Sequence, residues 1–571
     1  MKKILSIVLS VILAFSCISI GLTAFAQENT DIKFAVASDL HYVEPLEELE
    51  IEIPYEPVMW NANRRAAMEN ESGFIIDEFL RQCAADEELE FVLVSGDLAN
   101  DGRIIRQQHI DVAEKFRKFE AETGKPVYVI NGNHDNGAGE NDVTYKDFKE
   151  IYWEFGYDEA LYVDENTCSY VAELSEKYRL IALDSCDPTK STEDGMTKEK
   201  VNWVLDEAEK AYADGKYPIL MMHHNLLDHL PMQRILSRNF IIRNHLSTAN
   251  KFANAGIKLV FTGHEHCSDA AVYTSTLGNR IYDFATTSLT MYPAEYRMFT
   301  VTDEKISYEA KAIESIDIDA LTSTVAGYTE EHIALMNENF NSAYAKEYLK
   351  CGVQYRLGRD LKMEKIGIEE GEPFYNLVNT AVTGLNKILE YPLYGEGGIQ
   401  ELAAEYNIEI PDSEYENVWD VATELVSAHY AGEENYPLDS KEVTIFLRAV
   451  ALLLRDDLAA IGDETLLKAA NSLLESFGAK QGVAKGITRL CTAVFGGVSA
   501  VEYFLVALVS PLLYEFVLDD DGVPDNNGSI PGYGVTGAKV AASNIFERIS
   551  DIASLVAIYL SNVFKILFKI I

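Results

Sequence analysis

The chain has 571 residues, of which 48% are hydrophobic and 24% charged, so it can bury more than one core and is neither intrinsically disordered nor fibrous. It carries 91 acidic against 48 basic residues, which gives a formal net charge of −43 at pH 7. Because so acidic a surface repels phosphate backbones and anionic lipid headgroups, the composition argues against a nucleic-acid scaffold and a polybasic membrane binder.

The first 26 residues have the pattern of a secretory signal peptide. Residues 1–3 (Met-Lys-Lys) are positively charged, residues 4–21 are apolar, and residues 22–26 end in the small-x-small pattern that signal peptidase requires. The apolar run approaches a membrane-spanning length, so an uncleaved anchor is the alternative. We expect cleavage after Ala26 and a secreted mature protein.

Residues 27–315 alternate short apolar runs with amphipathic patterns. The predicted strands are 32–38, 91–96, 126–132, 178–184, 217–224, 257–263, 280–286 and 297–302, and the predicted helices are 73–83, 104–122 and 198–213. Strands that are continuously apolar are buried on both faces, so this pattern predicts a layered α/β domain with helices outside an internal sheet.

After about residue 316 the predicted strands stop. Four stretches place apolar residues at i, i+3 and i+4, namely 374–391, 416–430, 443–461 and 464–477. We therefore predict that residues 316–571 form a separate all-α C-terminal domain.

Two further segments of this region have distinctive patterns. Residues 519–527 carry oxygen donors at alternate positions and resemble extracellular calcium-binding loops, but a single copy without the terminal glutamate of an EF-hand favours a plain solvated turn, with a calcium site as the alternative. Residues 555–571 are apolar, with Lys565 and Lys569 near the end. This segment predicts a helix that docks on the helical domain, with membrane association as the alternative.

Metal-binding residue types follow the predicted strands. They occur as Asp39-Leu40-His41, Gly96-Asp97, Gly132-Asn133-His134-Asp135, His223-His224 and Gly263-His264-Glu265-His266. Loops at strand C-termini are where α/β folds place their sites, and oxygen and imidazole donors suit Zn, Mn or Fe. One such string alone is weak evidence for a metal site, but the ordered set predicts seven ligands for two metal ions that share one carboxylate.

These strings, together with Asn100-Asp101-Gly102 after Gly96-Asp97-Leu98, resemble the signature of the calcineurin-like metallophosphoesterases over about residues 31–313. The resemblance implies a four-layer α/β/β/α sandwich for residues 27–315. It implies that Asp39, His41 and His266 bind one ion, that Asn133, His223 and His264 bind the other, and that Asp97 bridges them. It also implies that His134 is not a ligand and instead protonates the leaving oxygen.

In such a site, two divalent cations clamp the phosphoryl group and hold a bridging hydroxide as the nucleophile. The cations would also allow so acidic a protein to bind an anionic phosphate ester. The Gly-Asn-His-Asp string and the His223-His224 pair are similar to the phosphodiesterase branch, so we predict a secreted phosphodiesterase. The alternatives are a phosphomonoesterase of the same fold and a metal-stabilised extracellular binding module without turnover.

The sequence leaves four alternatives undecided. Relatives carry Asp where this chain has Asn100, so the group that orients His134 is undetermined, and His224 could replace His223 as a ligand. Cys168 and Cys186 flank a predicted hairpin and are either a disulfide or two buried thiols. The arginines that could contact substrate oxygens, or lie on solvated faces, are Arg64, Arg65, Arg103, Arg106 and Arg297.

Overall fold

The structure is a computed structural model that describes residues 31–45, 66–355, 391–476, 488–507 and 522–534, apart from short gaps within these ranges, together with residues 379 and 389. The predicted signal peptide at 1–26, the acidic residues 519–521 and the apolar segment 555–571 lie outside the described residues. Within the described ranges, no helix combines the length and apolar character that crossing a bilayer requires.

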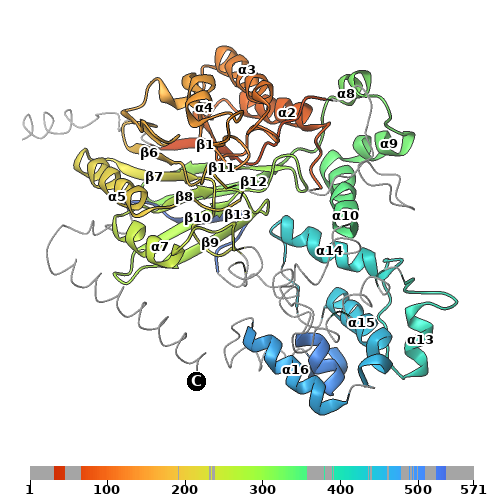
Figure 1. Ribbon diagram of the computed structural model, residues 1–571. Helices are drawn as coiled ribbons and strands as arrows, with labels where there is room; N and C mark the ends of the chain where they lie inside the picture. Colours follow the sequence, from red (N-terminus) through yellow and green to blue (C-terminus); the bar gives the residue numbers. More distant parts are fainter. Residues whose placement is uncertain are drawn as a thin grey trace, which may run out of the picture.

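Two β-sheets form the centre of the N-terminal part (Figure 1). The first sheet has the order β13 (Asn527–Pro531), β12 (Lys305–Ala312), β11 (Glu295–Val301), β1 (Ile32–Ala37), β2 (Phe91–Val94) and β3 (Val127–Val129). The second has the order β4 (Tyr162–Val163), β5 (Tyr170–Glu173), β6 (Tyr178–Leu183), β7 (Tyr217–Met222), β8 (Leu259–Thr262), β10 (Arg280–Ala285) and β9 (Asp269–Thr274). Neighbours in β1-β2-β3 and in β6-β7-β8-β10 are parallel.

Aromatic side chains join the two sheets face to face. Phe34 on β1 meets the ring of Phe261 on β8 at a centroid distance of 5.6 Å, and Phe299 on β11 meets Phe261 at 4.8 Å. Strands β1, β2, β6, β7 and β8 are buried along almost their whole length, as their continuous apolar sequences predict. The main core of this part therefore lies between the sheets.

Helices cover the outer faces of both sheets. Helices α2 (Ser72–Ala85), α3 (Arg106–Thr123) and α4 (Tyr145–Ile151), with the π-helical turn η1 (Trp153–Tyr157), lie on the side of the first sheet (Figure 1). Helix α5 (Lys198–Ala213) contacts β6 and β7, and α7 (His245–Asn254) contacts β9 and β10. The four-layer α/β/β/α arrangement predicted for this part is confirmed.

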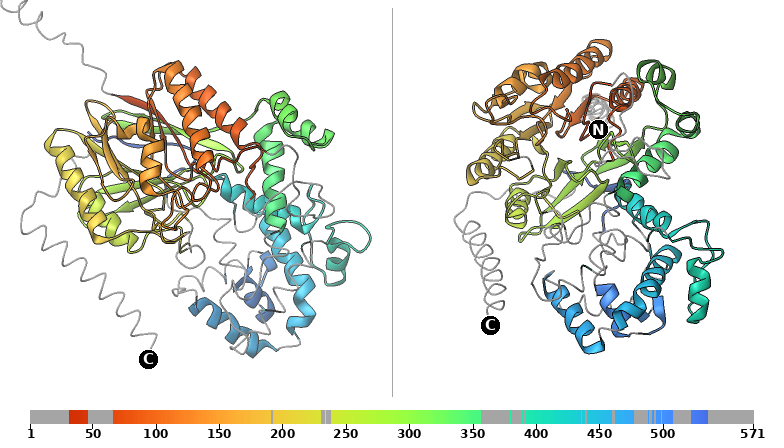
Figure 2. Two further views of the ribbon diagram at one scale, coloured as in Figure 1. Left: turned by 45° about the horizontal axis from the view of Figure 1, so that its top comes forward. Right: turned by 45° about the vertical axis from the view of Figure 1, so that its right-hand side comes forward.

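A helix-rich part follows. Its described elements are α8 (Ile318–Thr324), α9 (Glu330–Glu338), η2 (Phe340–Ala345), α10 (Lys346–Tyr355), α13 (Ile399–Glu405), α14 (Val418–Tyr430), α15 (Lys441–Ala459) and α16 (Asp463–Ser476). Both views of Figure 2 place α13 to α16 to one side of the sheets. Helix α14 joins the two parts, because Trp419 packs in the core of this region whereas Val426 packs in the core of the sheets.

Strand β13 differs from the all-α expectation for residues 316–571. It pairs antiparallel with β12 and occupies the edge of the first sheet. Its sequence, Asn-Gly-Ser-Ile-Pro, has one large apolar side chain and ends in proline, a composition tolerated at a sheet edge but without a strand-like apolar pattern. The core of the sheets includes Ile530 and Tyr533, so residues from near the end of the described chain complete the N-terminal part.

Candidate metal centre

The predicted ligands follow the C-terminal ends of five parallel strands. Asp39 and His41 follow β1, Asp97 follows β2, Asn133 follows β3, His223 follows β7, and His264 and His266 follow β8. These ends open onto the same edge of the two sheets, which is where α/β folds place their sites. The topology therefore brings together residues that are more than 200 positions apart in the sequence.

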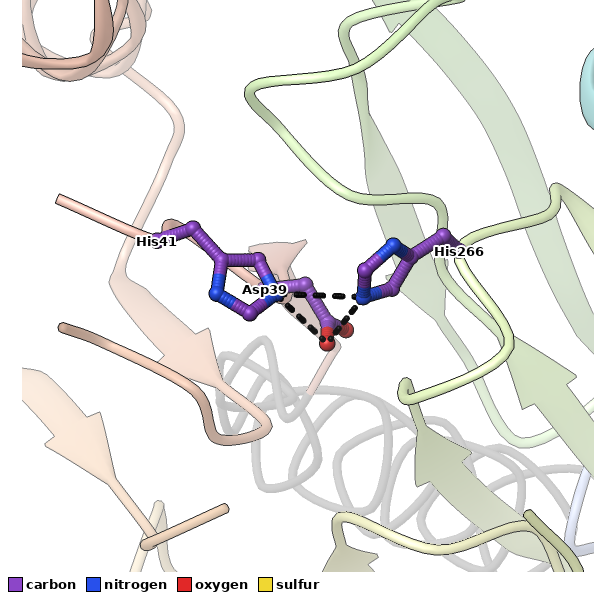
Figure 3. Close-up of side chains that lie close together, drawn as sticks. All are labelled: Asp39, His41 and His266. Carbon is purple, nitrogen blue, oxygen red and sulfur yellow. Dashed lines mark hydrogen bonds and ion pairs between the residues drawn. The ribbon is translucent and has the colours of Figure 1, made fainter. Parts of the chain in front are cut away.

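Asp39, His41 and His266 form the first cluster (Figure 3). The Nε2 atom of His266 lies 3.1 Å from Asp39 Oδ1 and 3.1 Å from His41 Nε2. The distance from His41 Nε2 to Asp39 Oδ1 is 3.7 Å. Three donor atoms from three loop positions thus converge on one point.

The second cluster contains Asp97, His223 and His264, whose donor atoms lie within 4.8 Å of one another. His223 Nε2 is 3.3 Å from Asp97 Oδ2 and 3.1 Å from Asn133 Oδ1. His223, not His224, therefore faces the asparagine. The ring of His224 instead places Nδ1 3.0 Å from Ser185 Oγ.

Asp97 connects the two clusters. Its Oδ2 is 3.8 Å from His41 Nε2 in the first cluster and 3.3 Å from His223 Nε2 in the second. Its Oδ1 accepts a hydrogen bond of 2.8 Å from the backbone N–H of His134, which fixes the carboxylate plane. One carboxylate oxygen therefore faces both sets of donors.

The donor atoms fit divalent cations. Asp39 Oδ1, Asp97 Oδ2 and His264 Nε2 are buried, and none of the three has a hydrogen-bond partner among the described residues. A buried polar atom without a hydrogen bond costs about 1–3 kcal/mol, more when it is charged, and at the two carboxylates the nearby nitrogens of His266 and His223 offset part of this cost. A cation that accepts their lone pairs removes this cost, and the mixture of carboxylate, amide and imidazole donors suits Zn, Mn or Fe.

The electrostatics of the clusters favour ligand-competent forms at Asp97 and His264. Burial opposes ionisation of Asp97, but His223 and His134 outweigh it and hold the pKa of Asp97 well below its usual value. Burial, followed by repulsion from His224 and His223, holds the pKa of His264 well below its usual value, so its ring is neutral. At His223, burial is outweighed by Asp97 and Asp39, which raise its pKa to about 9, so metal binding there must displace a proton.

The backbone at the site is held in an unfavourable conformation. Five candidate ligands have positive φ: Asp39 (50°), His41 (41°), Asp97 (49°), His264 (69°) and His266 (63°). Such left-handed angles cost free energy in residues other than glycine and persist where the surroundings enforce them. Two loop-to-loop bonds do so here: His41 N donates to Asp97 O over 3.0 Å, and His264 N donates to Asp39 Oδ2 over 2.9 Å.

A ring nitrogen of His134 lies within 4.8 Å of ligand atoms of His41 and Asp97, so these three residues form a third, overlapping group. The ring of His134 is edge-on to that of His41 at 4.9 Å between centroids. Its Nδ1 is 2.7 Å from the backbone carbonyl oxygen of Asn100. Because a carbonyl only accepts, Nδ1 carries the proton in this contact. The backbone carbonyl of Asn100 therefore fixes the orientation of the His134 ring.

The described arginines among those that could contact substrate, or lie on solvated faces, bind other parts of the protein. Arg297 is buried and donates to Ser268 Oγ and to the carbonyl oxygens of Asp269 and Ala285, and Arg103 donates to the carbonyls of residues 188 and 190. Arg106 pairs with Asp147 and Glu150 on the surface, whereas Arg64 and Arg65 lie outside the described residues.

The structure also describes the two cysteines that flank the predicted hairpin and part of the acidic segment 519–527. Cys168 and Cys186 are both buried free thiols, which excludes the disulfide alternative. In segment 519–527, which resembles calcium-binding loops, Asp525 Oδ1 accepts from Ala270 N and Asn526 Oδ1 accepts from Ser268 Oγ. These two oxygens are therefore committed to hydrogen bonds within the protein.

Sequence reasoning did not assign three neighbours of the centre. Asp135 accepts hydrogen bonds from Ala99 N (3.1 Å) and Gly132 N (2.7 Å) and thereby ties the Asp97 loop to the Asn133 loop. Phe240 stacks on His264 at 4.3 Å between ring centroids, and Met291 Sδ lies 3.0 Å from His266 Nδ1. Asp135 belongs to the Gly-Asn-His-Asp string and could have been found from it, but no sequence motif marks Phe240 or Met291.

Residues 32–268 match the calcineurin-like phosphoesterase family. No curated protein matches the chain. Solved structures that resemble it include a dimetal phosphatase from Danio rerio, at 10% identity and a TM-score of 0.36, over 49% of this chain and 96% of that one. A purple acid phosphatase from yellow lupin seeds aligns at 11% identity and a TM-score of 0.31, over 50% of this chain and 52% of that one. PhoD aligns at 11% identity and a TM-score of 0.33, over 50% and 66% respectively.

Proposed function

We propose that this chain, a metal-dependent phosphoester hydrolase by virtue of its calcineurin-like phosphoesterase domain at residues 32–268, cleaves phosphodiesters at a centre for two divalent metal ions. The observation that carries the proposal is the buried Oδ2 of Asp97, which has no hydrogen-bond partner in the described structure and lies between His41 and His223. One ion is assigned to Asp39, His41, His266 and Asp97, and the other to Asp97, Asn133, His223 and His264.

The ligand set determines the net charge of the proposed metal centre. When bound, the ions would neutralise the phosphoryl oxygens and activate a water molecule as the nucleophile. The ligand set contains two carboxylates, Asp39 and Asp97, against the four positive charges of two dications. The chain's own ligands therefore leave the centre cationic, and this positive charge attracts an anionic ester despite the acidic surface.

His134 is assigned the proton transfer to the leaving oxygen. The carbonyl of Asn100 occupies Nδ1, so Nε2 is the atom available to the substrate. A general acid must reach the leaving oxygen within hydrogen-bond distance, and the edge-on position of His134 beside His41 supports such a placement.

The preference for diesters is supported by the positions of Arg103, Arg106 and Arg297, the described arginines among those considered from the sequence as substrate contacts. A monoester presents a dianionic terminal phosphate, which is commonly bound by a guanidinium group as well as by metal ions. Arg103, Arg106 and Arg297 all contact other parts of the protein. A diester carries a single negative charge and has less need of an additional cation.

The test compares bis(p-nitrophenyl) phosphate with p-nitrophenyl phosphate at equal concentrations, with Mn²⁺ added to metal-stripped full-length protein. We expect the diester to have the higher kcat/KM. A higher kcat/KM for the monoester would identify a phosphomonoesterase instead. Stoichiometric metal binding without turnover of either ester would favour a binding module.

We predict that His134→Ala keeps both metal ions but slows diester hydrolysis by roughly 10²–10⁴-fold, the usual contribution of a general acid. The loss should be smaller for a p-nitrophenyl ester than for an alkyl ester, because p-nitrophenolate leaves without a proton. Metal analysis and rates on both esters measure this. Loss of metal from the variant would mean that His134 is a ligand.

We also propose that the protein is secreted, on the basis of the positively charged, apolar and small-x-small segments of residues 1–26. N-terminal sequencing of protein recovered from the culture medium should begin at Gln27. Recovery only in the membrane fraction with Met1 retained would contradict this.

A further inference from the structure

The loop that carries His264 and His266 is supported by residues from the helix-rich part of the chain. Two residues after His266, the backbone N–H of Ser268 donates to the carbonyl oxygen of Tyr430 over 3.0 Å. The hydroxyl of Ser268 donates to Asn526 Oδ1 over 2.9 Å. Both acceptors lie more than 150 positions further along the chain.

A directional chain of hydrogen bonds passes through Ser268. The buried Arg297 donates from Nη2 to Ser268 Oγ over 2.9 Å, and Ser268 Oγ donates onward to Asn526 Oδ1. Asn526 Nδ2 then donates to the carbonyl oxygen of Ala431, in the turn after α14, over 2.6 Å. Guanidinium and amide N–H groups can only donate, so the direction of the chain is fixed.

The segment around Asn526 is anchored on two sides. Its backbone carbonyl accepts from Ala310 N over 2.7 Å, which continues the pairing of β13 with β12. The neighbouring Asp525 accepts from Ala270 N over 3.0 Å through Oδ1, at the start of β9. Asn526 therefore has a rigid base from which to hold Ser268.

The ligand loop needs such support. His264 and His266 have φ values of 69° and 63°, a conformation that local preference does not maintain in histidine. On the other side of the loop, the carbonyl of His266 accepts from Thr287 Oγ1 over 2.7 Å. Contacts to Thr287, to Asn526 and to α14 therefore hold this loop in place.

We propose that Asn526 is a positioning residue for the metal centre and acts through Ser268 on the loop that carries His264 and His266. This rests on the proposed function, in which these histidines bind metal. The helix-rich part of the chain then helps to support the metal centre, through the turn after α14 and the segment before β13.

The test is Asn526→Ala in the full-length protein, with Mn²⁺ affinity measured by competition with a chelator well below the melting temperature. Outer contacts of metal ligands typically contribute 10–100-fold in affinity, so we expect about a 10-fold loss. Backbone amides of residues 264–268 should also exchange faster with deuterium. The matched control is Asn527→Ala, which removes the exposed side chain of the next residue and should leave both readouts unchanged.

A second variant, Ser268→Ala, removes the middle link of the same chain. If Asn526 acts through Ser268, the double variant should lose no more Mn²⁺ affinity than either single variant, because coupled residues are not additive. Additive losses would overturn the proposal. So would a lower melting temperature with wild-type Mn²⁺ affinity in Asn526→Ala, because the residue would then be merely stabilising. Absence of stoichiometric Mn²⁺ binding in the wild-type protein would instead overturn the proposed function.

Discussion

Asp97→Asn is expected to abolish phosphodiester hydrolysis and to release metal from both halves of the centre. The substitution keeps the shape of the side chain but removes the charge of the oxygen that lies 3.8 Å from His41 Nε2 and 3.3 Å from His223 Nε2. Two dications at short range then repel each other without the shared anion. Since outer contacts alone contribute 10–100-fold in metal affinity, loss of a shared ligand should cost more than about 100-fold.

Metal content after gel filtration and kcat/KM on bis(p-nitrophenyl) phosphate measure the two effects. The matched control is Asp77→Asn, which removes the same charge from an exposed ion pair with Lys115 and should change neither value. Two metal ions per chain and near-normal turnover in Asp97→Asn would contradict the binuclear assignment.

A chain covering only residues 27–316 is expected not to form a stable, active domain, although the sequence pattern predicts a boundary there. It lacks β13, so β12 becomes an exposed sheet edge that favours aggregation. It also lacks the Asp525 carbonyl that pairs with the buried Arg297 guanidinium. Unpaired groups of this kind cost about 1–3 kcal/mol each, a large fraction of the stability of a domain.

A second buried group loses its partners in the same truncation. Glu71 Oε1 accepts from the hydroxyls of Tyr328 (2.6 Å) and Tyr344 (2.7 Å), and both tyrosines lie beyond residue 316. Soluble yield, near-UV circular dichroism and metal content should therefore all fall. The control is residues 27–534, which retains β13 and should keep two metal ions. Wild-type metal content and turnover in residues 27–316 would establish that unit as self-sufficient.

The parts of the fold that could be predicted from the sequence are those in which the residues of a strand themselves form a recognisable apolar pattern. Strands β1, β2, β7 and β8 are continuously apolar and buried, so their positions and the loops after them could be located directly. Strand β13 could not, because its place at the sheet edge depends on pairing with β12 rather than on its own composition. Long-range pairing of this kind leaves little trace in a local pattern.

The same distinction applies to the candidate centre. Aspartate, asparagine and histidine are visible as residue types, so their order indicated a metal site, and the family resemblance implied which of them would bind the ions. The contact from His134 to the carbonyl of Asn100 could not be predicted, since every residue has a carbonyl and only the loop conformation selects this one. The burial of Arg297 could not be predicted for a related reason, because burial of a guanidinium depends on acceptors supplied by distant segments.

The carbonyl of Asn100 beside His134 has a consequence for work in acid. A carboxylate partner loses its acceptor charge once it is protonated, and a histidine that depends on it can then turn out of alignment. A peptide carbonyl keeps its lone pairs over the whole range in which proteins stay folded. The ring of His134 is thus aimed by a contact that acidification does not switch off, so a decline in turnover at low pH would not arise from a lost orientation of this ring.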